Sequence, residues 1–335
     1  MQPRFYKKLI AKQLGQDFKS AVEIVELRIP EPAAHEIVIR NQFAGVNAGF
    51  DTLLCRGEVP YANLTPPFDL GVEAVGEVIA VGSDVTDIKI GDAVATTVRG
   101  GGYREYQAIA ANLAIKVRQA TPDILTLMPT GVSAMVALEQ VGEMGSGEVV
   151  LVTAAAGGTG HIAVQLAKLA GNHVIGTCGS DAKSEFLKKL GCDRVINYKQ
   201  ENVDEVLKGE YPDGINLVFE CVGKEIFDIC VNNLAVRGRL VVVGFISEYA
   251  YQLEAVYQPR IYSKLFWKAA SVRGFLMPRY GDYIPEARDR ILDLFYTGKL
   301  QVAVDSTEFK GIESVTAAVE YLLSGQNCGK VVVRF

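Results

Sequence analysis

The sequence predicts an α/β fold in which a doubly wound parallel sheet is joined to a second domain made mainly of short strands. Three features lead to this prediction: the length of 335 residues, a change of texture near residue 129, and the alternation of strands and helices beyond it. A chain of this length exceeds what one hydrophobic core usually serves. Two domains are therefore expected.

The N-terminal part consists of short runs rich in β-type residues. Residues 36–40, 76–81 and 92–95 are such runs, and turn signals such as residues 82–84 separate them. Many short strands with few helical periods indicate a barrel or a sandwich.

Beyond residue 129, apolar strands alternate with longer amphipathic helices. The five strands are predicted at residues 148–152, 173–177, 194–196, 215–220 and 239–245. The helices between them include residues 161–170, 181–190 and 226–234. This alternation is typical of a parallel sheet with helices on both faces.

The part beyond Tyr249 begins with an irregular, tyrosine-rich segment. Helices are predicted at residues 284–296 and 312–323, and a last strand at residues 330–334. A strand needs a sheet to pair with, so we expect this strand to return to the first domain.

Composition and charge argue against several classes of protein. Hydrophobic residues make up 49% and charged residues 22%, as in folded domains. The net charge of −5 predicts no nucleic-acid partner. The most apolar stretch, residues 149–170, is interrupted by glycines, His161 and Lys168, so no membrane span is predicted. The six cysteines lie singly and read as reduced thiols, which favours the cytoplasm or an organelle matrix.

A glycine-rich turn joins the first strand of the parallel sheet to the next helix. Glycines let the backbone approach a pyrophosphate, and the helix that follows directs its unpaired N–H groups and positive dipole end at that anion. The same glycines also occur where a turn only needs tight packing. The position between strand and helix favours a dinucleotide site, formed by Thr153, Ala156, Gly157, Gly158, Thr159 and Gly160.

The residues after the second strand indicate which dinucleotide binds. An NAD site usually has an acidic residue at the end of this strand. Asp181 lies several residues further on, where Ser180 and Asp181 are typical of a helix cap and first turn. Lys183 in that first turn opposes the helix dipole unless a phosphate is near. Ser180, Lys183 and Tyr198 are therefore predicted to bind the 2′-phosphate of NADPH, although all three also fit a solvated surface.

Two further motifs resemble those of a known family. Residues 71–82, GVEAVGEVIAVG, resemble the G-x-E-x-x-G-x-V-x-x-V-G signature of the medium-chain dehydrogenase/reductase superfamily, and residues 88–94 resemble its K-x-G-D-x-V turn. The resemblance covers nearly the whole chain. It implies a GroES-like, partly open β-barrel domain at residues 1–126 and 265–335, split around a Rossmann domain at residues 127–264.

The positions of the superfamily's zinc ligands carry other residues. Asn47 stands where zinc members have a cysteine, Val72 where they have a histidine, and no cysteine lies between Cys55 and Cys178. No metal site is therefore predicted. Hydride addition to an isolated carbonyl benefits from a Lewis acid, whereas addition to the β-carbon of an enone forms an enolate that hydrogen-bond donors can stabilise. The resemblance to the zinc-free branch thus implies conjugated C=C bonds or quinones as substrates.

The resemblance also implies roles for individual residues. Asn47 is expected near the nicotinamide and substrate, although a turn amide that binds the backbone is the competing interpretation. Tyr61 resembles a tyrosine at the mouth of the active site, in a loop of different length. Four tyrosines in the segment that covers the substrate in relatives could donate to the enolate oxygen or simply pack, namely Tyr249, Tyr251, Tyr257 and Tyr262, of which Tyr262 is taken as the catalytic candidate.

Several loop residues are expected to contact NADPH. Ser133 keeps the hydroxyl of a threonine that contacts the cofactor in relatives, and the ends of the fourth and fifth strands form the ligand-binding edge of an open sheet. The competing interpretation for each is ordinary loop chemistry. These expected contacts are Ser133, Cys221, Val222, Gly244, Phe245, Ile246 and Asn327.

Together these patterns predict an NADPH-dependent reductase that transfers hydride to the β-carbon of an enone, such as a 15-oxoprostaglandin-like ketone. A quinone oxidoreductase is the first alternative. An NADPH-binding protein without a catalytic role is the second, because no acid/base dyad can be identified. The resemblance also implies a homodimer that pairs through the edge of the Rossmann sheet.

Overall fold

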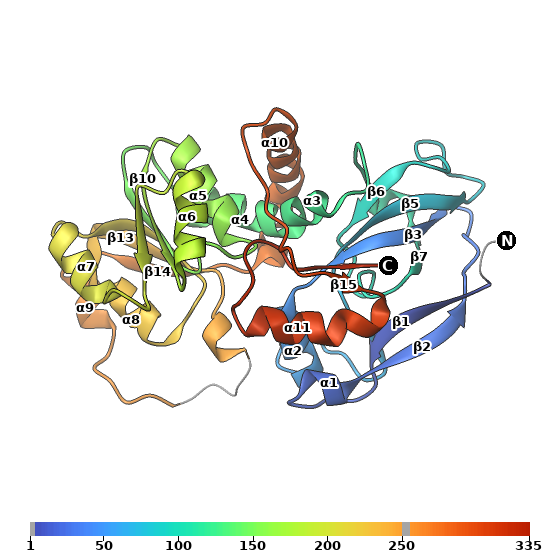
Figure 1. The fold of residues 1–335 in the computed structure, drawn as a ribbon, viewed down its shortest axis with the longest axis horizontal. Helices are drawn as coiled ribbons and strands as arrows, with labels where there is room; N and C mark the ends of the chain where they lie inside the picture. Colours follow the sequence, from blue (N-terminus) through green and yellow to red (C-terminus); the bar gives the residue numbers. More distant parts are fainter. Residues whose placement is uncertain (1–3, 250–254) are drawn as a thin grey trace. The chain divides into compact units, whose positions relative to one another are not determined.

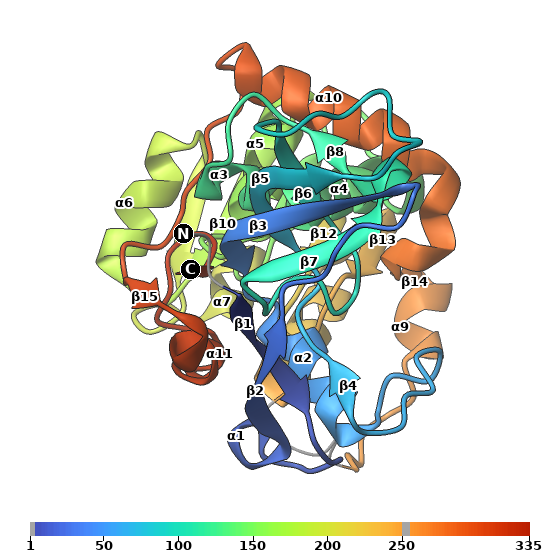
Figure 2. The same cartoon turned by 90° about the vertical axis from the view of Figure 1, so that its right-hand side faces the viewer.

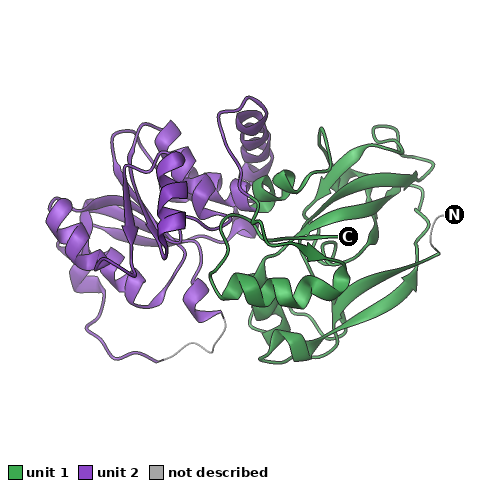
Figure 3. Ribbon diagram, in the orientation of Figure 1, with its two compact units in different colours: residues 1–129, 304–335 green, residues 130–303 purple. Residues whose placement is uncertain are grey.

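The computed structural model describes residues 4–249 and 255–335, and it divides the chain into two compact units. Unit 1 comprises residues 1–129 and 304–335, and unit 2 comprises residues 130–303 (Figure 3).

The second unit extends further than the sequence indicated. The Rossmann domain was expected to end at residue 264, but unit 2 continues to Ala303. The reason is strand β14 (Ser271–Gly274), which pairs in parallel with β13 (Leu234–Val242), and helix α10 (Ile284–Tyr296), whose Arg290 forms an ion pair with Glu139. Residues 265–303 therefore belong to unit 2, and only residues 304–335 return to unit 1.

Unit 2 is a doubly wound α/β domain, as predicted (Figure 1). Its six strands form one parallel sheet in the order β11-β10-β9-β12-β13-β14. The first four in the sequence are β9 (Val149–Val152), β10 (His173–Cys178), β11 (Arg194–Asn197) and β12 (Ile215–Glu220). The order reverses between β9 and β12, which is where sheets of this kind bind ligands.

The helices of unit 2 connect the strands and cover the sheet. Leu151, Ile175, Val218 and Leu240 are fully buried in the core between sheet and helices, as expected for strands covered on both faces. The helices are α4 (Val132–Val136), α5 (Gly160–Leu169), α6 (Asp181–Lys189), α7 (Val203–Glu210), α8 (Lys224–Asn232), α9 (Tyr262–Phe266) and α10.

Unit 1 contains two sheets and agrees with the predicted pattern of short strands. The smaller sheet has the order β2-β1-β4, and the larger runs β15-β16-β3-β5-β6-β8 with β7 also paired to β3. Figure 2 shows β3 between β5 and β7. The strands are β1 (Phe5–Ala11), β2 (Val22–Arg28), β3 (Glu36–Gly45), β4 (Phe68–Asp69), β5 (Ala74–Val81), β6 (Ala93–Thr96), β7 (Tyr106–Ala110), β8 (Ile115–Lys116), β15 (Phe309–Lys310) and β16 (Val332–Arg334).

The C-terminal strand returns to the first domain, as predicted. β16 pairs antiparallel with β3, with Val333 opposite Ala44. Helices α2 (Ala48–Arg56) and α11 (Val315–Leu323) contact each other beside this sheet; the shorter helices of unit 1 are α1 (Phe18–Ala21) and α3 (Pro122–Leu125). The pairing brings the residues just before β16 next to those just after β3.

Among the described residues, one helical stretch has the length and apolar composition to cross a membrane. It spans residues 122–141, and 72% of its most apolar window is buried.

Candidate active site

The glycine turn of unit 2 joins β9 to α5 at a position where only glycine fits. A Cβ atom on Gly160 would lie 2.5 Å from the carbonyl oxygen of Ala154 and 2.8 Å from the Cα atom of Ala155. Contacts that short do not occur in folded proteins, so any side chain at this position would push α5 away from the strand. Gly160 therefore allows the close approach of helix and strand.

The start of α5 offers backbone donors to an anion. Among the residues that the structure describes, the amides of Gly158, Thr159 and Gly160 donate to no acceptor. They lie at the N-terminal end of a ten-residue helix, where the helix dipole is positive. The arrangement suits a phosphate or pyrophosphate group.

His161 holds the glycine turn in place from inside the unit. Its Nε2 accepts a hydrogen bond from the amide of Ala303 at 3.1 Å, so its Nδ1 carries the proton and donates to the carbonyl of Gly157 at 2.8 Å. Burial lowers the pKa of the imidazole to about 4, which keeps it neutral. Gln165, one turn further along α5, bonds to both backbone groups of Gln301 at 2.8 Å.

The predicted 2′-phosphate residues lie at the carboxyl ends of β10 and β11. Ser180 caps α6 by accepting from the amide of Lys183 at 3.3 Å. A Cβ atom on Gly179 would lie 2.5 Å from the hydroxyl of Tyr198, so the glycine makes room for this half-exposed ring. The three predicted residues thus follow neighbouring strands, since Cys178 of β10 pairs with Asn197 of β11.

Asp181 has a structural role, as its position indicated. Its Oδ1 atom accepts hydrogen bonds from Asn197 Nδ2 and Gln200 Nε2, both at 2.9 Å. These bonds tie the first turn of α6 to the end of β11. The carboxylate is therefore engaged within the protein.

Thr153 is not placed to contact a dinucleotide, contrary to the expectation from the turn. The residue is 0% exposed. Its Oγ1 donates to Glu220 Oε1 at 3.3 Å and accepts from the amide of Cys221 at 2.8 Å. The threonine joins the ends of β9 and β12 beneath the surface.

Glu220 organises the loop after β12. Its Oε1 accepts from the amides of Val222 at 2.7 Å and Gly223 at 3.0 Å, in addition to Thr153. Burial raises the pKa of this carboxyl, and the two amides oppose the shift. Glu220 holds the backbone of Cys221 and Val222 at the carboxyl edge of the sheet.

The loops after β12 and β13 are joined by hydrogen bonds. The amide of Ile246 donates to the carbonyl of Cys221 at 3.0 Å, and Ser247 Oγ donates to the carbonyl of Val222 at 2.6 Å. Tyr249 lies here as well: its hydroxyl accepts from the amide of Phe245 at 3.2 Å. Burial raises the pKa of Tyr249 to about 12, so its hydroxyl keeps its proton.

The other three tyrosines do not share this position. Tyr262, the catalytic candidate from the sequence, begins α9 and lines a separate cavity with Phe266 and Trp267. That cavity includes Ala269 and Ala270, which precede β14 and so lie at the amino end of this strand. Tyr262 therefore lies toward the opposite end of β14 from the carboxyl edge of the sheet. Tyr257 is fully exposed, and Tyr251 lies outside the described residues.

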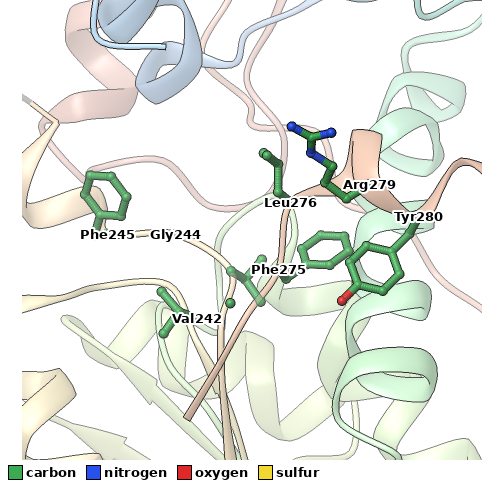
Figure 4. A pocket seen from close by; sticks show the side chains of 9 residues that line it. Val242, Gly244, Phe245, Phe275, Leu276, Arg279 and Tyr280 are labelled. Atoms are coloured by element: carbon green, nitrogen blue, oxygen red, sulfur yellow. The ribbon is translucent and has the colours of Figure 1, made fainter. Parts of the chain in front are cut away.

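A cavity of about 480 Å³ lies at the carboxyl ends of β13 and β14 (Figure 4). Phe245, from the predicted set, lines it together with Phe275 and Tyr280, whose ring centroids are 5.6 Å apart. Ser133 of α4 donates from Oγ to the sulfur of Met277 at 2.9 Å, between the lining residues Phe275 and Tyr280. The remaining lining residues are Val242, Val243, Gly244, Gly274, Leu276 and Arg279.

Unit 1 contains a buried polar cluster around Asn47. Asn47 Nδ2 donates to Glu73 Oε1 at 2.7 Å, and Asn47 Oδ1 accepts from Lys330 Nζ at 3.0 Å. Lys330 also forms a 2.6 Å ion pair with Glu73, and these two side chains are 2% and 0% exposed. The Asn47 side chain therefore bonds to side chains and does not cap α2, so the simple turn interpretation does not hold.

This cluster fixes the orientation of the Asn47 amide. One carboxylate accepts from its nitrogen and one ammonium donates to its oxygen, so the amide cannot turn over without losing both bonds. One N–H of the amide is used by Glu73. Burial raises the pKa of Glu73, while the Lys330 ammonium opposes that shift.

A second buried carboxyl group lies one turn away on α2. Asp51 Oδ2 accepts from the Tyr103 hydroxyl at 2.6 Å, and both side chains are fully buried. Burial raises the pKa of Asp51 to about 7. Its Oδ1 atom has no hydrogen-bond partner among the described residues, as suits a group that readily takes up a proton.

Tyr61 and Asn327 lie in loops of unit 1. Tyr61 follows α2 and is 41% exposed. Asn327 Nδ2 donates to the carbonyl of Gly329 at 2.9 Å, immediately before Lys330. Across residues 4–249 and 255–335, no three His, Cys, Asp or Glu side chains come together as metal ligands do.

Comparison with known proteins identifies the family. Residues 33–119 match the family described as "Alcohol dehydrogenase GroES-like domain", and residues 158–295 match that described as "Zinc-binding dehydrogenase". The chain is 43% identical to prostaglandin reductase-3 of Mus musculus, over 99% of this chain and 90% of that protein. The chain belongs to the medium-chain dehydrogenase/reductase superfamily. It is also 40% identical to a probable quinone oxidoreductase of Leishmania amazonensis, over 99% and 98% of the two chains.

Solved structures of the superfamily share the fold. The quinone oxidoreductase of Escherichia coli, determined with NADPH, superposes with a TM-score of 0.83 at 27% identity, over 98% of this chain and 100% of that one. The predicted fold class, a GroES-like domain with a Rossmann domain, is confirmed.

Sequence patterns missed several residues that hold predicted site residues in place within each unit. Glu73 lies within the family signature, but nothing local indicates that it binds Asn47. Lys330 and Glu220 look like ordinary strand-end residues. The only local signal for Lys330 is a charged residue beside an apolar final strand, which predicts neither burial nor its partners.

Proposed function

We propose that this chain is an NADPH-dependent oxidoreductase that reduces the C=C bond of α,β-unsaturated ketones. The observation that carries the proposal is the set of open amides at the N-terminus of α5, together with Lys183 and Ser180 at the end of the neighbouring strand. Relatives whose names state an activity support it, among them prostaglandin reductase-3 and, at 30% identity, an NADP(+)-dependent 2-alkenal reductase of Nicotiana tabacum.

The residues of unit 2 suit the parts of NADPH. The amides of Gly158, Thr159 and Gly160 bind the pyrophosphate, with Gly157 and Ala156 close to it. Ser180, Lys183 and Tyr198 bind the 2′-phosphate. Loop residues at the carboxyl edge of the sheet complete the site: Ser133, Cys221, Val222, Gly244, Phe245 and Ile246. Asn327 of unit 1 is proposed as a further contact, by resemblance alone.

When bound, NADPH supplies a hydride, which the β-carbon of the enone accepts. The chain's own task is to orient the substrate and to stabilise the negative charge on the carbonyl oxygen. Tyr249 is the proposed donor to that oxygen, because its hydroxyl stays protonated at the carboxyl edge. Asn47 is proposed to contact the nicotinamide or substrate with its remaining N–H, in an orientation set by Glu73 and Lys330. Tyr61 is proposed to line the entrance, by resemblance.

Substitution of Lys183 tests whether the protein binds NADPH through its 2′-phosphate. Lys183→Met should raise the Kd for NADPH about 10- to 100-fold, because a charge-assisted contact to a phosphate is lost, and should leave the Kd for NADH unchanged. Lys189→Met, in the last turn of the same helix, is the matched control and should change neither. Titration calorimetry measures both constants. If Lys183→Met raised the Kd values for NADPH and NADH by the same factor, the proposed role of Lys183 at the 2′-phosphate would be contradicted.

The reaction is tested by following NADPH absorbance with a panel of enones. Turnover is expected with at least one, and the product should be the saturated ketone rather than the allylic alcohol. If the protein binds NADPH tightly but none of the tested acceptors leads to oxidation of NADPH, it would instead be a binding protein without a catalytic role.

A quinone oxidoreductase is a second candidate, supported by the 40% identity to a probable quinone oxidoreductase. The same assay with quinones separates the two. A higher kcat/KM for quinones, or semiquinone radicals detected by spin resonance, would favour this alternative.

A homodimer is proposed through the open edge of the Rossmann sheet. β14 is the last strand in the sheet order, so one side of it has no strand partner within the described residues. Exposed aromatic side chains precede it: Phe266 is 74% and Trp267 81% exposed. Sedimentation equilibrium should show a dimer, and Trp267→Asp should shift it toward monomer.

The free state of all six cysteines supports a reducing compartment, the cytoplasm or an organelle matrix.

A further inference from the structure

Arg279 differs from most arginines of its unit in having no carboxylate partner. Arg194, Arg239, Arg273, Arg288 and Arg290 all form ion pairs. Among the described residues, the guanidinium of Arg279 makes no ion pair and no hydrogen bond. Its five N–H donors are therefore available to a ligand.

The surroundings of Arg279 are apolar. It lines the cavity of about 480 Å³ with Phe245, Phe275, Leu276 and Tyr280, and none of the lining residues carries a negative charge. Figure 4 shows the Phe275 and Tyr280 rings side by side, with Arg279 and Leu276 close to each other above them. Arg279 itself is exposed. A cavity of this size with aromatic walls and one unpaired cation suits a small organic molecule with an anionic group.

We propose that Arg279 binds the carboxylate of the substrate, so that the preferred substrates are enones with an anionic tail. The proposal rests on the proposed function above, since Gly244 and Phe245, which are assigned to NADPH there, also line this cavity. Phe275 and Tyr280 hold the carbon chain, while Gly244 and Phe245 stay with NADPH. The guanidinium forms two parallel N–H bonds to the two carboxylate oxygens.

The sheet order argues against the cofactor's phosphates as the partner of Arg279. The pyrophosphate site follows β9, which is separated from β14 by β12 and β13. Three steps of about 4.8 Å place these positions about 14 Å apart. The 2′-phosphate residues follow β10 and β11, still further from β14 in the sheet.

The test compares linear vinyl ketones that end in a carboxylate with their methyl esters, over several spacer lengths. The wild-type enzyme should prefer the acid by about 10- to 100-fold in kcat/KM at the best spacer length, the value of a charge-assisted pair. Arg279→Met should abolish this preference by raising KM for the acid, with little change for the ester. Arg237→Met, an exposed arginine away from the cavity, is the control and should behave as wild type.

The possible outcomes separate the two proposals. No reduction of acid or ester by the wild type would contradict the proposed function itself. Equal reduction of both at every spacer length, or an unchanged preference in Arg279→Met, would overturn the role of Arg279 while the reductase assignment stands. A raised Kd for NADPH in Arg279→Met, with the acid preference intact, would assign the arginine to the cofactor instead.

Discussion

The two units build their candidate sites from different materials. In unit 2 the candidate anion site consists of backbone amides at Gly158, Thr159 and Gly160, in a turn held by uncharged side chains such as His161. In unit 1 the site around Asn47 consists of charged side chains, a carboxylate and an ammonium that are almost fully buried. One site depends on backbone geometry, and the other depends on a balance of buried charges.

This difference determines how each site can fail. A backbone site tolerates most side-chain changes but not an added Cβ where strand and helix touch. A buried ion pair tolerates small shifts of the backbone but not the loss of one partner, because the remaining charge cannot be hydrated. Three predictions test this contrast.

The largest effect is expected from removing the buried cation of unit 1. Lys330→Met should lower the free energy of unfolding by about 3–5 kcal/mol, because Glu73 keeps a buried charge without its partner. Urea unfolding measures the loss. Binding of adenosine 2′,5′-bisphosphate, which needs only the phosphate residues of unit 2, should be unchanged.

The double variant makes this prediction sharper. Lys330→Met with Glu73→Gln removes both charges and should be clearly more stable than Lys330→Met alone. If the free energy of unfolding of Lys330→Met falls by less than about 1 kcal/mol, as for a solvent-exposed ion pair, then Lys330 and Glu73 do not form a buried ion pair.

An intermediate effect is expected from adding one methyl group to the glycine turn. Gly160→Ala should cost about 1–3 kcal/mol of stability through overpacking, and should raise the Kd for NADPH at least about 10-fold, because α5 moves away from Ala154. Gly209→Ala is the matched control, since a Cβ there meets no atom within 4 Å and lies in α7. It should stabilise the protein by about 0.5–1 kcal/mol. Normal NADPH binding by Gly160→Ala would refute the proposed role of this glycine.

The smallest effect is a pair of opposite pH dependences, one from each unit. Burial raises the pKa of Asp51 from 3.8 to about 7 in the folded protein. The folded state therefore holds the extra proton, and its contribution to stability falls as the pH rises from about 4 to about 7. The pKa of His161 is about 4 against 6.5, so the unfolded chain binds the proton first, and stability falls as the pH drops from about 6.5 to about 4.

Two variants separate these contributions. Relative to wild type, Asp51→Asn should gain stability as the pH rises between about 4.5 and 6.5, and His161→Gln should lose it, each by at most about 1.4 kcal/mol per pH unit. Urea titrations at several pH values measure both slopes, with His173→Gln, at an exposed histidine, as control. Slopes of the same sign would contradict the assigned protonation states.

The same contrast explains which sequence predictions held. The strands and helices of unit 2 were predicted because burial on both faces of a parallel sheet leaves a periodic pattern in the chain. Ser180 and Asp181 were correctly expected at the cap and first turn of a helix, where Asp181 has a structural role. Thr153 and Tyr262 do not lie where the prediction needs them, because local pattern does not reveal that Thr153 is buried under the sheet edge or that Tyr262 lies toward the amino end of β14. The domain boundary at residue 264 missed β14 for a similar reason: a short edge strand has little periodicity.

Local sequence was enough to specify the doubly wound sheet, the glycine turn and the family, since each depends on backbone geometry and on residues close together in the chain. Only the folded chain decided which side chains meet. Asn47 is 26 positions from Glu73 and 283 from Lys330, and the three come together because β5 and β16 both pair with β3. Arg279 and Tyr249 likewise acquire their proposed roles from the strands whose carboxyl ends they follow. Contacts between distant residues depend on how the strands pair, and the spacing along the chain carries no record of that pairing.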